Sequence, residues 1–161
     1  MRSLLVAVVA SLAVGVTVPA LAAGGGGGGG SMEQTRPADP NYTRAKSMIE
    51  AKDYRGALPL LQQVVAKDPK NADAYNLMGY ATRKSGDAAG SLQFYQQALA
   101  VDPRHIGAYE YLGEAYLMLN RLPDAEQQLA RLDSLCTFGC TEYRMLKTAI
   151  ADFKAGKRPT N

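Results

Sequence analysis

Two cysteines are the residues in this chain whose type and spacing come nearest to a known chemistry. Cys136 and Cys140 are separated by three residues, one more than in the Cys-x-x-Cys pair of thioredoxin-like enzymes, and the strand pattern of that fold is absent. One interpretation is a thiol–disulfide redox pair. The interpretation we favour is a structural disulfide between two successive helices, with Gly139 letting the short loop turn sharply. Closing so small a loop would contribute about 2 kcal/mol to stability.

Metal and catalytic chemistry find little support in the sequence. His105 is the only histidine, which excludes a histidine-rich metal site. Asp133 lies near the two cysteines, but the three residues show no common ligand spacing. The sequence also has no nucleophile elbow, phosphate-binding glycine loop or dinucleotide fingerprint. We therefore expect no enzymatic activity, no cofactor and no metal.

The balance of charge argues against a nucleic-acid partner. The chain has 161 residues, with 18 basic and 15 acidic side chains and a formal net charge of +3. Nucleic-acid binding needs a clustered basic face, which this distribution does not provide. Lys154, Lys157 and Arg158 give the C-terminal end, including the tail at 156–161, a local basic character. We expect these side chains to be solvated, without contact to a membrane.

The N-terminal segment has the layout of a secretory signal peptide. Met1 and Arg2 provide a positive start, residues 4–18 are almost entirely apolar, and Ala20 and Ala22 offer the small residues that a signal peptidase reads. A membrane anchor is the alternative, but the apolar run falls short of the roughly 20 residues that span a bilayer. We expect residues 1–22 to be removed on export, with a Gram-negative periplasm as the expected destination. An even pair of cysteines in an exported protein favours a disulfide.

A glycine run separates this segment from the rest of the chain. Residues 24–30 are all glycine and offer no side chains to bury. Glycine also loses the most conformational entropy on ordering. We interpret residues 23–37 as a flexible linker, although a low-complexity stretch without a role is an equal alternative.

The remainder of the chain contains an internal repeat. The motif Tyr-x-x-Met-Gly at 75–79 returns as Tyr-x-x-Leu-Gly at 109–113, and Asp-Pro at 68–69 returns at 102–103, so both motifs recur at the same interval. A fixed period of this kind indicates one supersecondary unit copied in tandem. Such a unit cannot bury its apolar face alone, so the copies must stack.

Capping residues and prolines divide this region into helices and leave no segment that reads as a strand. Asp39, Asp53, Asn71 and Asp87 are suitable N-caps, and Gly86 is a suitable C-terminal stop. Thr141 is the expected cap of the last helix. Helices are expected over about 40–52, 54–67, 72–85, 88–101, 105–119, 122–134 and 141–155. Pro59 falls past the first turn of the second helix and should delay or bend its start.

This pattern resembles the tetratricopeptide repeat family, whose unit is an antiparallel pair of helices of about 34 residues. The resemblance implies an all-α solenoid over 38–155, with repeats at 38–71, 72–105 and 106–139 and a capping helix at 141–155. The first repeat is degenerate, because it lacks the leading aromatic residue and the glycine. Gly79 and Gly113 lie within helices, where glycine costs about 1 kcal/mol relative to alanine. We expect them to admit the paired helix, carrying Ser91 or Ala125.

The resemblance also implies where a ligand binds. In this family the first helix of each pair lines a concave groove. Transferred position by position, the expected peptide-binding residues are Tyr42, Lys46, Asn76, Tyr80, Arg83, Lys84, Glu110, Tyr111 and Glu114. The asparagine and lysine set with which some members hold a C-terminal carboxylate is not reproduced.

The implied function is a non-catalytic scaffold or adaptor that holds a protein or peptide in the cell envelope. Two alternatives remain open. The first is a thiol–disulfide redox protein that uses the two cysteines. The second is a structural homo-oligomer that stacks through the degenerate first repeat.

Overall fold

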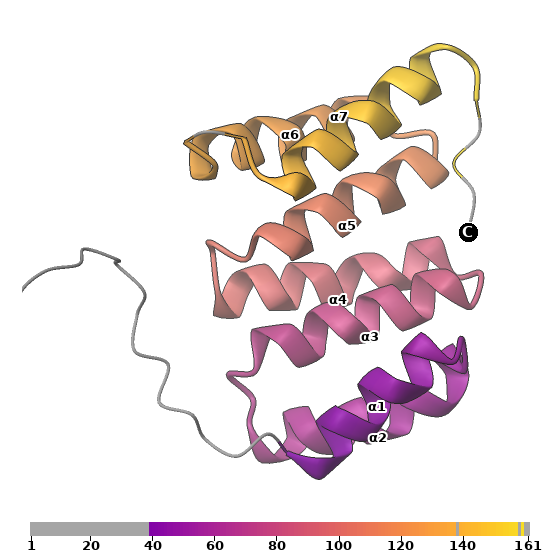
Figure 1. The fold of residues 1–161 in the computed structure, drawn as a ribbon, viewed down its shortest axis with the longest axis vertical. Helices are drawn as coiled ribbons and strands as arrows, with labels where there is room; N and C mark the ends of the chain where they lie inside the picture. Colours follow the sequence, from indigo (N-terminus) through magenta and orange to yellow (C-terminus); the bar gives the residue numbers. More distant parts are fainter. Residues whose placement is uncertain (1–38, 138, 158, 160–161) are drawn as a thin grey trace, which may run out of the picture. The chain divides into compact units, whose positions relative to one another are not determined.

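The computed structural model describes residues 39–137, 139–157 and 159, so the predicted signal peptide and the whole predicted linker lie outside the described residues. All described residues belong to one compact unit, Thr35–Asn161. They form seven helices and contain no strand, which confirms the all-α class (Figure 1). The helices are α1 (Pro40–Glu50), α2 (Tyr54–Lys67), α3 (Ala72–Lys84), α4 (Ala88–Val101), α5 (Ile106–Met118), α6 (Leu122–Leu135) and α7 (Thr141–Lys154).

The predicted N-caps begin their helices as expected. Asp53 Oδ1 accepts a hydrogen bond from the Gly56 N–H at 3.0 Å, and Asn71 and Asp87 make the corresponding bonds for α3 and α4. These bonds satisfy donors that the first turn of a helix leaves unpaired. Asp39 caps α1 in a similar way, accepting from Asn41.

The cap of α7, the effect of Pro59 on α2 and the end of α1 differ from the sequence prediction, while the other helix bounds shift by at most one residue. Cys140, not Thr141, is the N-cap of α7, because its Sγ accepts from the Tyr143 N–H at 3.4 Å. Helix α2 begins at Tyr54, directly after its cap, so the late start predicted from Pro59 is wrong; Pro59 lies on the exposed side of the helix. Helix α1 ends at Glu50, because Lys52 adopts a left-handed φ of 63°.

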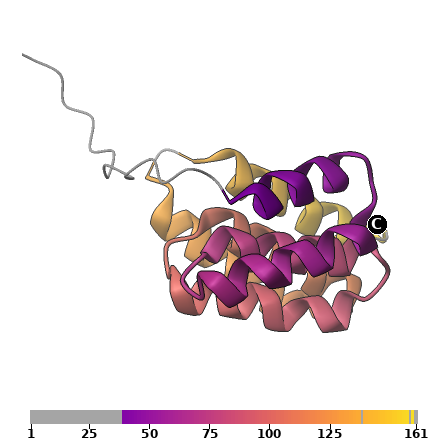
Figure 2. The same ribbon diagram turned by 90° about the horizontal axis from the view of Figure 1, so that it is seen from below.

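The helices stack as consecutive pairs. α1 packs on α2, α3 on α4 and α5 on α6, while α7 packs on both α5 and α6. Contacts also join α1 to α3, α3 to α5 and α5 to α7, so these four helices share one face of the stack (Figures 1 and 2). We call the surface formed by α1, α3, α5 and α7 the first-helix face. Among the described helices, none is both long enough and apolar enough to cross a membrane.

The apolar interior consists of two clusters. The N-terminal cluster joins α1, α2 and the start of α3, and its buried members are Ala45, Ala57, Leu61, Val64, Ala74 and Met78. The C-terminal cluster joins α4 to α7, and its buried members are Tyr95, Leu112, Ala115, Tyr116, Leu117, Ala125, Leu132, Leu146 and Ile150. Since Leu146 and Ile150 belong to α7, this last helix is part of the interior of the third pair.

The two mid-helix glycines admit different neighbours. A Cβ added to Gly79 would lie 2.5 Å from a ring carbon of Tyr95 on α4. The paired helix therefore approaches Gly79 closely, as expected, but the nearest side chain is Tyr95 and not Ser91. A Cβ added to Gly113 would lie 2.5 Å from a methyl carbon of Leu146 on α7. The prediction that Gly113 admits Ala125 is therefore wrong, because α7 approaches α5 more closely at that position.

The cysteine loop connects α6 to α7. The sulfur atoms of Cys136 and Cys140 lie at bonding distance, and Gly139 between them has a φ of 76°. This positive φ produces the sharp turn that was predicted at Gly139. The arrangement fits a staple between two helices, and formation of the disulfide in the protein stays a prediction, tested below.

Candidate functional site

An arginine that lies beside two neighbouring tyrosine rings occupies the middle of the first-helix face. The guanidinium carbon of Arg83 lies 5.6 Å from the ring centroid of Tyr80 and 5.6 Å from that of Tyr111. The two ring centroids are 5.1 Å apart. These distances are within the range of cation–π attraction. We call Tyr80, Arg83 and Tyr111 the cation stack; it joins α3 to α5, the first helices of two successive pairs.

The charge of Arg83 is compensated inside the protein. Its Nη2 lies 2.8 Å from Glu114 Oε2, and its Nε donates to the Tyr95 hydroxyl at 3.4 Å. The Arg83 side chain is 4% exposed, whereas that of Glu114 is 25% exposed. Arg83 is therefore a buried cation with its own carboxylate, and its guanidinium is already occupied. Glu114 is the member of this ion pair that is partly exposed to solvent.

Glu110 and Asn76 bring unpaired polar atoms to the same face. Among the described residues, Glu110 Oε1 and Asn76 Oδ1 are buried and have no hydrogen-bond partner. Glu110 is only 3% exposed. Burial, and then the neighbouring Glu114 and Glu142, raise the pKa of Glu110 to about 8, although Arg83 opposes the shift. Glu110 therefore retains its proton at neutral pH and can act as a hydrogen-bond donor.

This raised pKa makes stability depend on pH. Unfolded Glu110 titrates near its ordinary pKa of 4.5, and folded Glu110 near about 8. Between these two pKa values the unfolded chain has released the Glu110 proton, whereas the folded chain still holds it. The contribution of Glu110 to the free energy of unfolding is therefore complete below pH 4.5 and is lost as the pH rises to about 8. We expect Glu110→Gln, which cannot ionise, to flatten this slope and to raise stability at pH 7. Urea unfolding across this range measures it.

Glu50→Gln is the matched control, because Glu50 is exposed on α1. It should keep the slope of the wild-type protein. If Glu110→Gln also keeps that slope, Glu110 ionises in the folded state and its assignment as a buried acid is wrong.

His105 has a structural position. Its Nδ1 accepts from the Ala108 N–H at 3.1 Å, which caps α5, and its Nε2 lies 3.1 Å from Asp73 Oδ1 on α3. The hydrogen bond to Asp73 raises the pKa of His105 above its ordinary value. Among the described residues, no group of three or more His, Cys, Asp or Glu side chains is placed to hold a metal ion.

The first-helix face continues onto α7, which sequence analysis treated only as a cap. An open depression of about 410 Å³ is lined by Glu114 of α5 and by Thr141, Arg144, Met145, Thr148, Ala149 and Asp152 of α7. Met145 is 48% exposed. The sequence did contain a signal for these residues. Arg144 stands one repeat length after Glu110, and Thr148 stands one repeat length after Glu114, so both occupy positions equivalent to predicted groove residues. Tyr54 was also missed: its ring lies 6.1 Å from that of Tyr80, edge to face.

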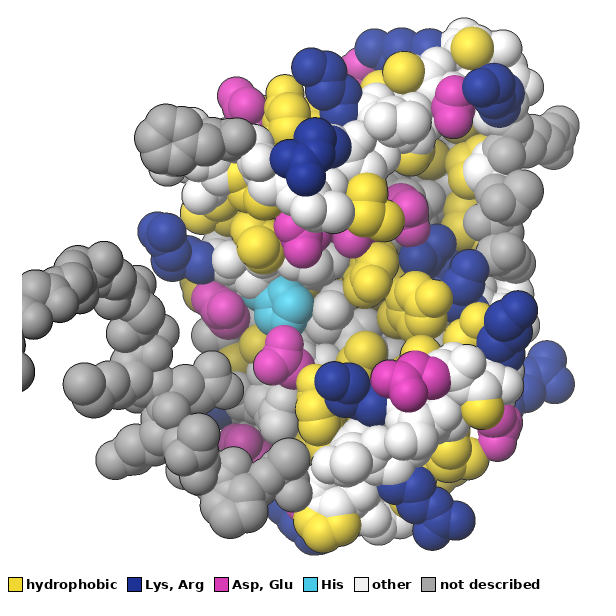
Figure 3. All heavy atoms as spheres, in the orientation of Figure 1, with side chains coloured by type: hydrophobic (Ala, Val, Ile, Leu, Met, Phe, Trp, Pro, Cys, Tyr) yellow, Lys and Arg dark blue, Asp and Glu magenta, His cyan; other side chains and the backbone are white. Residues whose placement is uncertain are grey.

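The structure brings together most of the predicted groove residues. Tyr80, Arg83, Tyr111 and Glu114 meet around the cation stack, and the Lys84 ammonium lies 5.8 Å from the Tyr80 ring centroid. Figure 3 shows this face, with hydrophobic side chains gathered in its middle and charged ones around them.

Other predicted groove residues lie apart from the stack or deeper than a ligand contact requires. Tyr42 packs against the N-terminal core cluster, and Lys46 is exposed on α1. Asn76 and Glu110 are buried, as is Arg83 of the cation stack, because the neighbouring first helices lie close enough to cover them. Whether any of these residues contacts a ligand stays a prediction.

Comparisons with known proteins agree with this architecture. Two sequence profiles described as tetratricopeptide repeat match residues 42–106 and 83–150. A search of the curated proteins finds no match.

Several solved structures share the fold. The second tetratricopeptide domain of human RPAP3, in complex with the HSP70 peptide SGPTIEEVD, is 19% identical with a TM-score of 0.64, over 71% of this chain and 92% of that one. The Yersinia enterocolitica type III secretion chaperone SycD, in complex with a peptide of the translocator YopD, is 17% identical with a TM-score of 0.63, over 72% and 88%. The TPR2B domain of yeast Sti1, in a complex with pHsp70, is 17% identical with a TM-score of 0.66, over 73% and 95%.

These likenesses establish the fold, and the two profiles identify the repeat. Together the profiles cover residues 42–150, which is more than half of the 161 residues. The helices that they span are the ones that form the first-helix face and the cation stack. The chain therefore belongs to the tetratricopeptide repeat family.

Proposed function

We propose that this protein is a non-catalytic scaffold or adaptor that binds a peptide segment of another protein on its first-helix face. The observation that carries the proposal is the cation stack, in which Tyr80 and Tyr111 present half-buried aromatic rings from two neighbouring first helices. Tyrosine suits an interface because it combines a large apolar ring with a hydroxyl group. Solved structures of the same fold include complexes with peptides, which supports this class of ligand.

The polar groups on the face narrow the chemistry of the ligand. Arg83 is paired with Glu114, and Arg144 donates to the Gly139 carbonyl at 3.0 Å and to Thr141 Oγ1 at 3.1 Å. Arg83 is therefore neutralised inside the chain and is not free to bind a carboxylate, whereas Arg144 is held only by neutral groups. Glu114, which is partly exposed, favours donors such as backbone N–H groups and basic side chains.

Tyr80→Ala should weaken binding of any peptide that uses this face. Truncating an interface anchor of this type costs about 2 kcal/mol or more, which is about a 30-fold loss of affinity. Peptides selected from a random display library on the full-length protein provide the ligands, and isothermal titration calorimetry measures their affinity. Gln97→Ala is the control, because Gln97 is exposed on α4, outside the first-helix face. Selected peptides that bind the Tyr80 variant as tightly as wild type would place the binding surface elsewhere.

Export to the cell envelope is part of the same proposal and is supported by the sequence of residues 1–22. The protein recovered after export should begin at Ala23 and should contain the Cys136–Cys140 disulfide. Intact-mass measurement tests both expectations: the mass should lack residues 1–22 and should increase by two hydrogen atoms after reduction. A mass that includes Met1 would contradict export with cleavage, and a mass unchanged by reduction would contradict the disulfide.

A further inference from the structure

The chain reverses direction directly after α7. Gly156 has a φ of 82°, its N–H donates to the Phe153 carbonyl at 3.0 Å, and the Lys157 N–H donates to the Asp152 carbonyl at 3.0 Å. This pair of bonds is the Schellman arrangement, in which a left-handed glycine ends a helix and turns the chain back. Lys157 Nζ then donates to Asp152 Oδ1 at 2.8 Å. The turn at Gly156 and Lys157 is therefore held by two backbone bonds and an ion pair.

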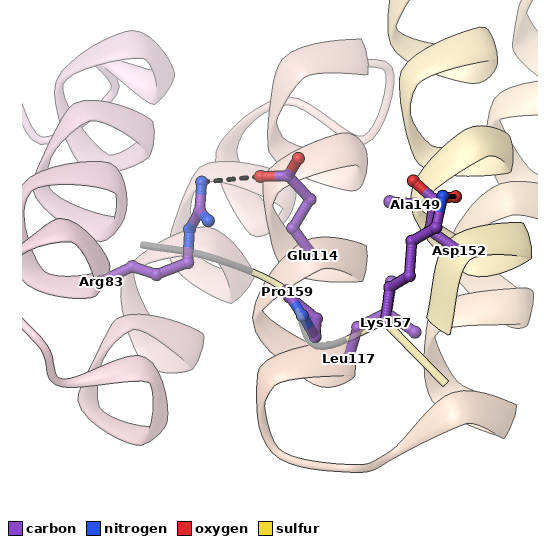
Figure 4. Close-up of a pocket in the computed structure, with 7 residues that line it drawn as sticks. All are labelled: Arg83, Glu114, Leu117, Ala149, Asp152, Lys157 and Pro159. Carbon is purple, nitrogen blue, oxygen red and sulfur yellow. Dashed lines mark hydrogen bonds and ion pairs between the residues drawn. The ribbon is translucent and has the colours of Figure 1, made fainter. Parts of the chain in front are cut away.

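Beyond this reversal, Pro159 lies near the first-helix face (Figure 4). Pro159 and Lys157 line a cavity of about 250 Å³ together with Arg83 of α3, Glu114 and Leu117 of α5, and Ala149 and Asp152 of α7. Figure 4 shows Pro159 in front of α5, beside Leu117 and below Glu114, while Lys157 extends along α7 to Asp152. The segment thus reaches the Arg83–Glu114 pair at the edge of the cation stack. Here a peptide segment is already in place on the proposed binding surface.

The other residues around this cavity suit Lys157 and Pro159 chemically. Leu117 and Ala149 place apolar surface near the Pro159 ring. Asp152 pairs with Lys157, which stands two residues before that proline. Glu114 is the remaining acid, and its pairing with Arg83 leaves it partly exposed. Proline also loses little conformational entropy on binding, because its φ is already fixed in an extended conformation.

We propose that Lys157 and Pro159 act as an internal ligand of the first-helix face. We further propose that the C-terminal half of this face recognises external segments of the same type, with a basic residue two positions before a proline. This inference rests on the proposed function and specifies its ligand class. A tethered segment competes at a local concentration in the millimolar range when the linker is short. An external peptide must therefore displace it, which reduces the apparent affinity of the intact chain.

A fluorescently labelled peptide with the sequence Ala-Gly-Lys-Arg-Pro-Thr-Asn, taken from residues 155–161, tests the proposal by fluorescence anisotropy. The full-length variant Lys157→Glu with Pro159→Gly should release the internal ligand, and both changes lie beyond the last helix, so helicity should be retained. Lys154→Ala is the matched control, because Lys154 pairs with Glu126 of α6 at 2.6 Å and does not line the cavity. We expect the peptide to bind the released variant about tenfold more tightly than wild type or control.

Two further peptides test the recognition itself. Replacing the proline of the probe with alanine, or its lysine with glutamate, should weaken binding to the released variant. Equal binding of the original probe to all three proteins, or equal binding of the three peptides to the released variant, would overturn the proposal. Such a result would leave the proposed function standing if library peptides still depended on Tyr80. Alternatively, library peptides could bind the Tyr80 variant as tightly as wild type while the probe still binds the released variant tenfold more tightly than wild type. That result would overturn the proposed role of the cation stack and support the internal ligand.

Discussion

Replacing Arg83 with methionine is expected to lower the free energy of unfolding by about 3 kcal/mol. Removing one member of a buried ion pair typically costs about 3–5 kcal/mol, because the remaining charge stays buried without a partner. Here the low end of that range applies, since Glu114 is 25% exposed and can be solvated. The cost then comes chiefly from the Tyr95 hydroxyl, which loses its buried partner, and from the lost contacts of the guanidinium with the Tyr80 and Tyr111 rings.

A double-mutant cycle with Glu114→Gln separates the pair from its surroundings. Urea unfolding of both single variants and of the double variant should give a double-variant loss smaller than the sum of the single losses, because the second change removes the charge that the first leaves unpaired. Lys154→Met is the control: its ion pair with Glu126 is exposed and should be worth at most about 1 kcal/mol. If Arg83→Met costs no more than this control, the buried cation does not hold α3 to α5.

Gly79→Leu should also destabilise the protein, by about 3 kcal/mol. An added Cβ would lie 2.5 Å from the ring of Tyr95, a side chain with no exposed surface, so the ring cannot move aside without disturbing the interior. Overpacking of this kind costs about 1–3 kcal/mol, and the rigid aromatic neighbour favours the upper value. A lower thermal midpoint and a lower urea midpoint should both report it.

Gly107→Ala is the matched control, because the nearest atom to an added Cβ there is 3.5 Å away, at Asn76 Nδ2. Gly107 lies in the first turn of α5, and alanine should leave stability unchanged or raise it by up to about 1 kcal/mol. Unchanged midpoints in Gly79→Leu would show that α3 and α4 can separate at this contact without loss of packing.

Local features of the fold were predictable because their causes lie within a few residues. A helix start needs a side-chain acceptor beside the first turn, so Asp53, Asn71 and Asp87 could be read directly from the sequence. The left-handed stops at Gly86 and Asn120 follow from the same local reasoning. The cap at Cys140 was missed because cysteine is a weak acceptor and Thr141 beside it is a better one.

Features that depend on distant neighbours were not predictable in the same way. Positional transfer placed Arg83 and Glu110 on the binding face, but their burial depends on α5 and α7, which lie far along the chain. The close approach of Leu146 to Gly113 likewise depends on how α7 docks. Tyr54 was missed because it belongs to α2, outside the set of first helices, and reaches Tyr80 only through the folded arrangement.

The equivalent positions along the first-helix face carry three different functional groups. Asn76, Glu110 and Arg144 follow one another at the interval of the repeat and lie on α3, α5 and α7 in turn. A repeat protein with identical units would let an extended ligand slide by one unit and find the same environment again. Here one such step replaces an amide with an acid, and a second replaces the acid with a base. The face therefore differs from one repeat to the next at this position, and a segment bound as proposed would have one preferred alignment along it.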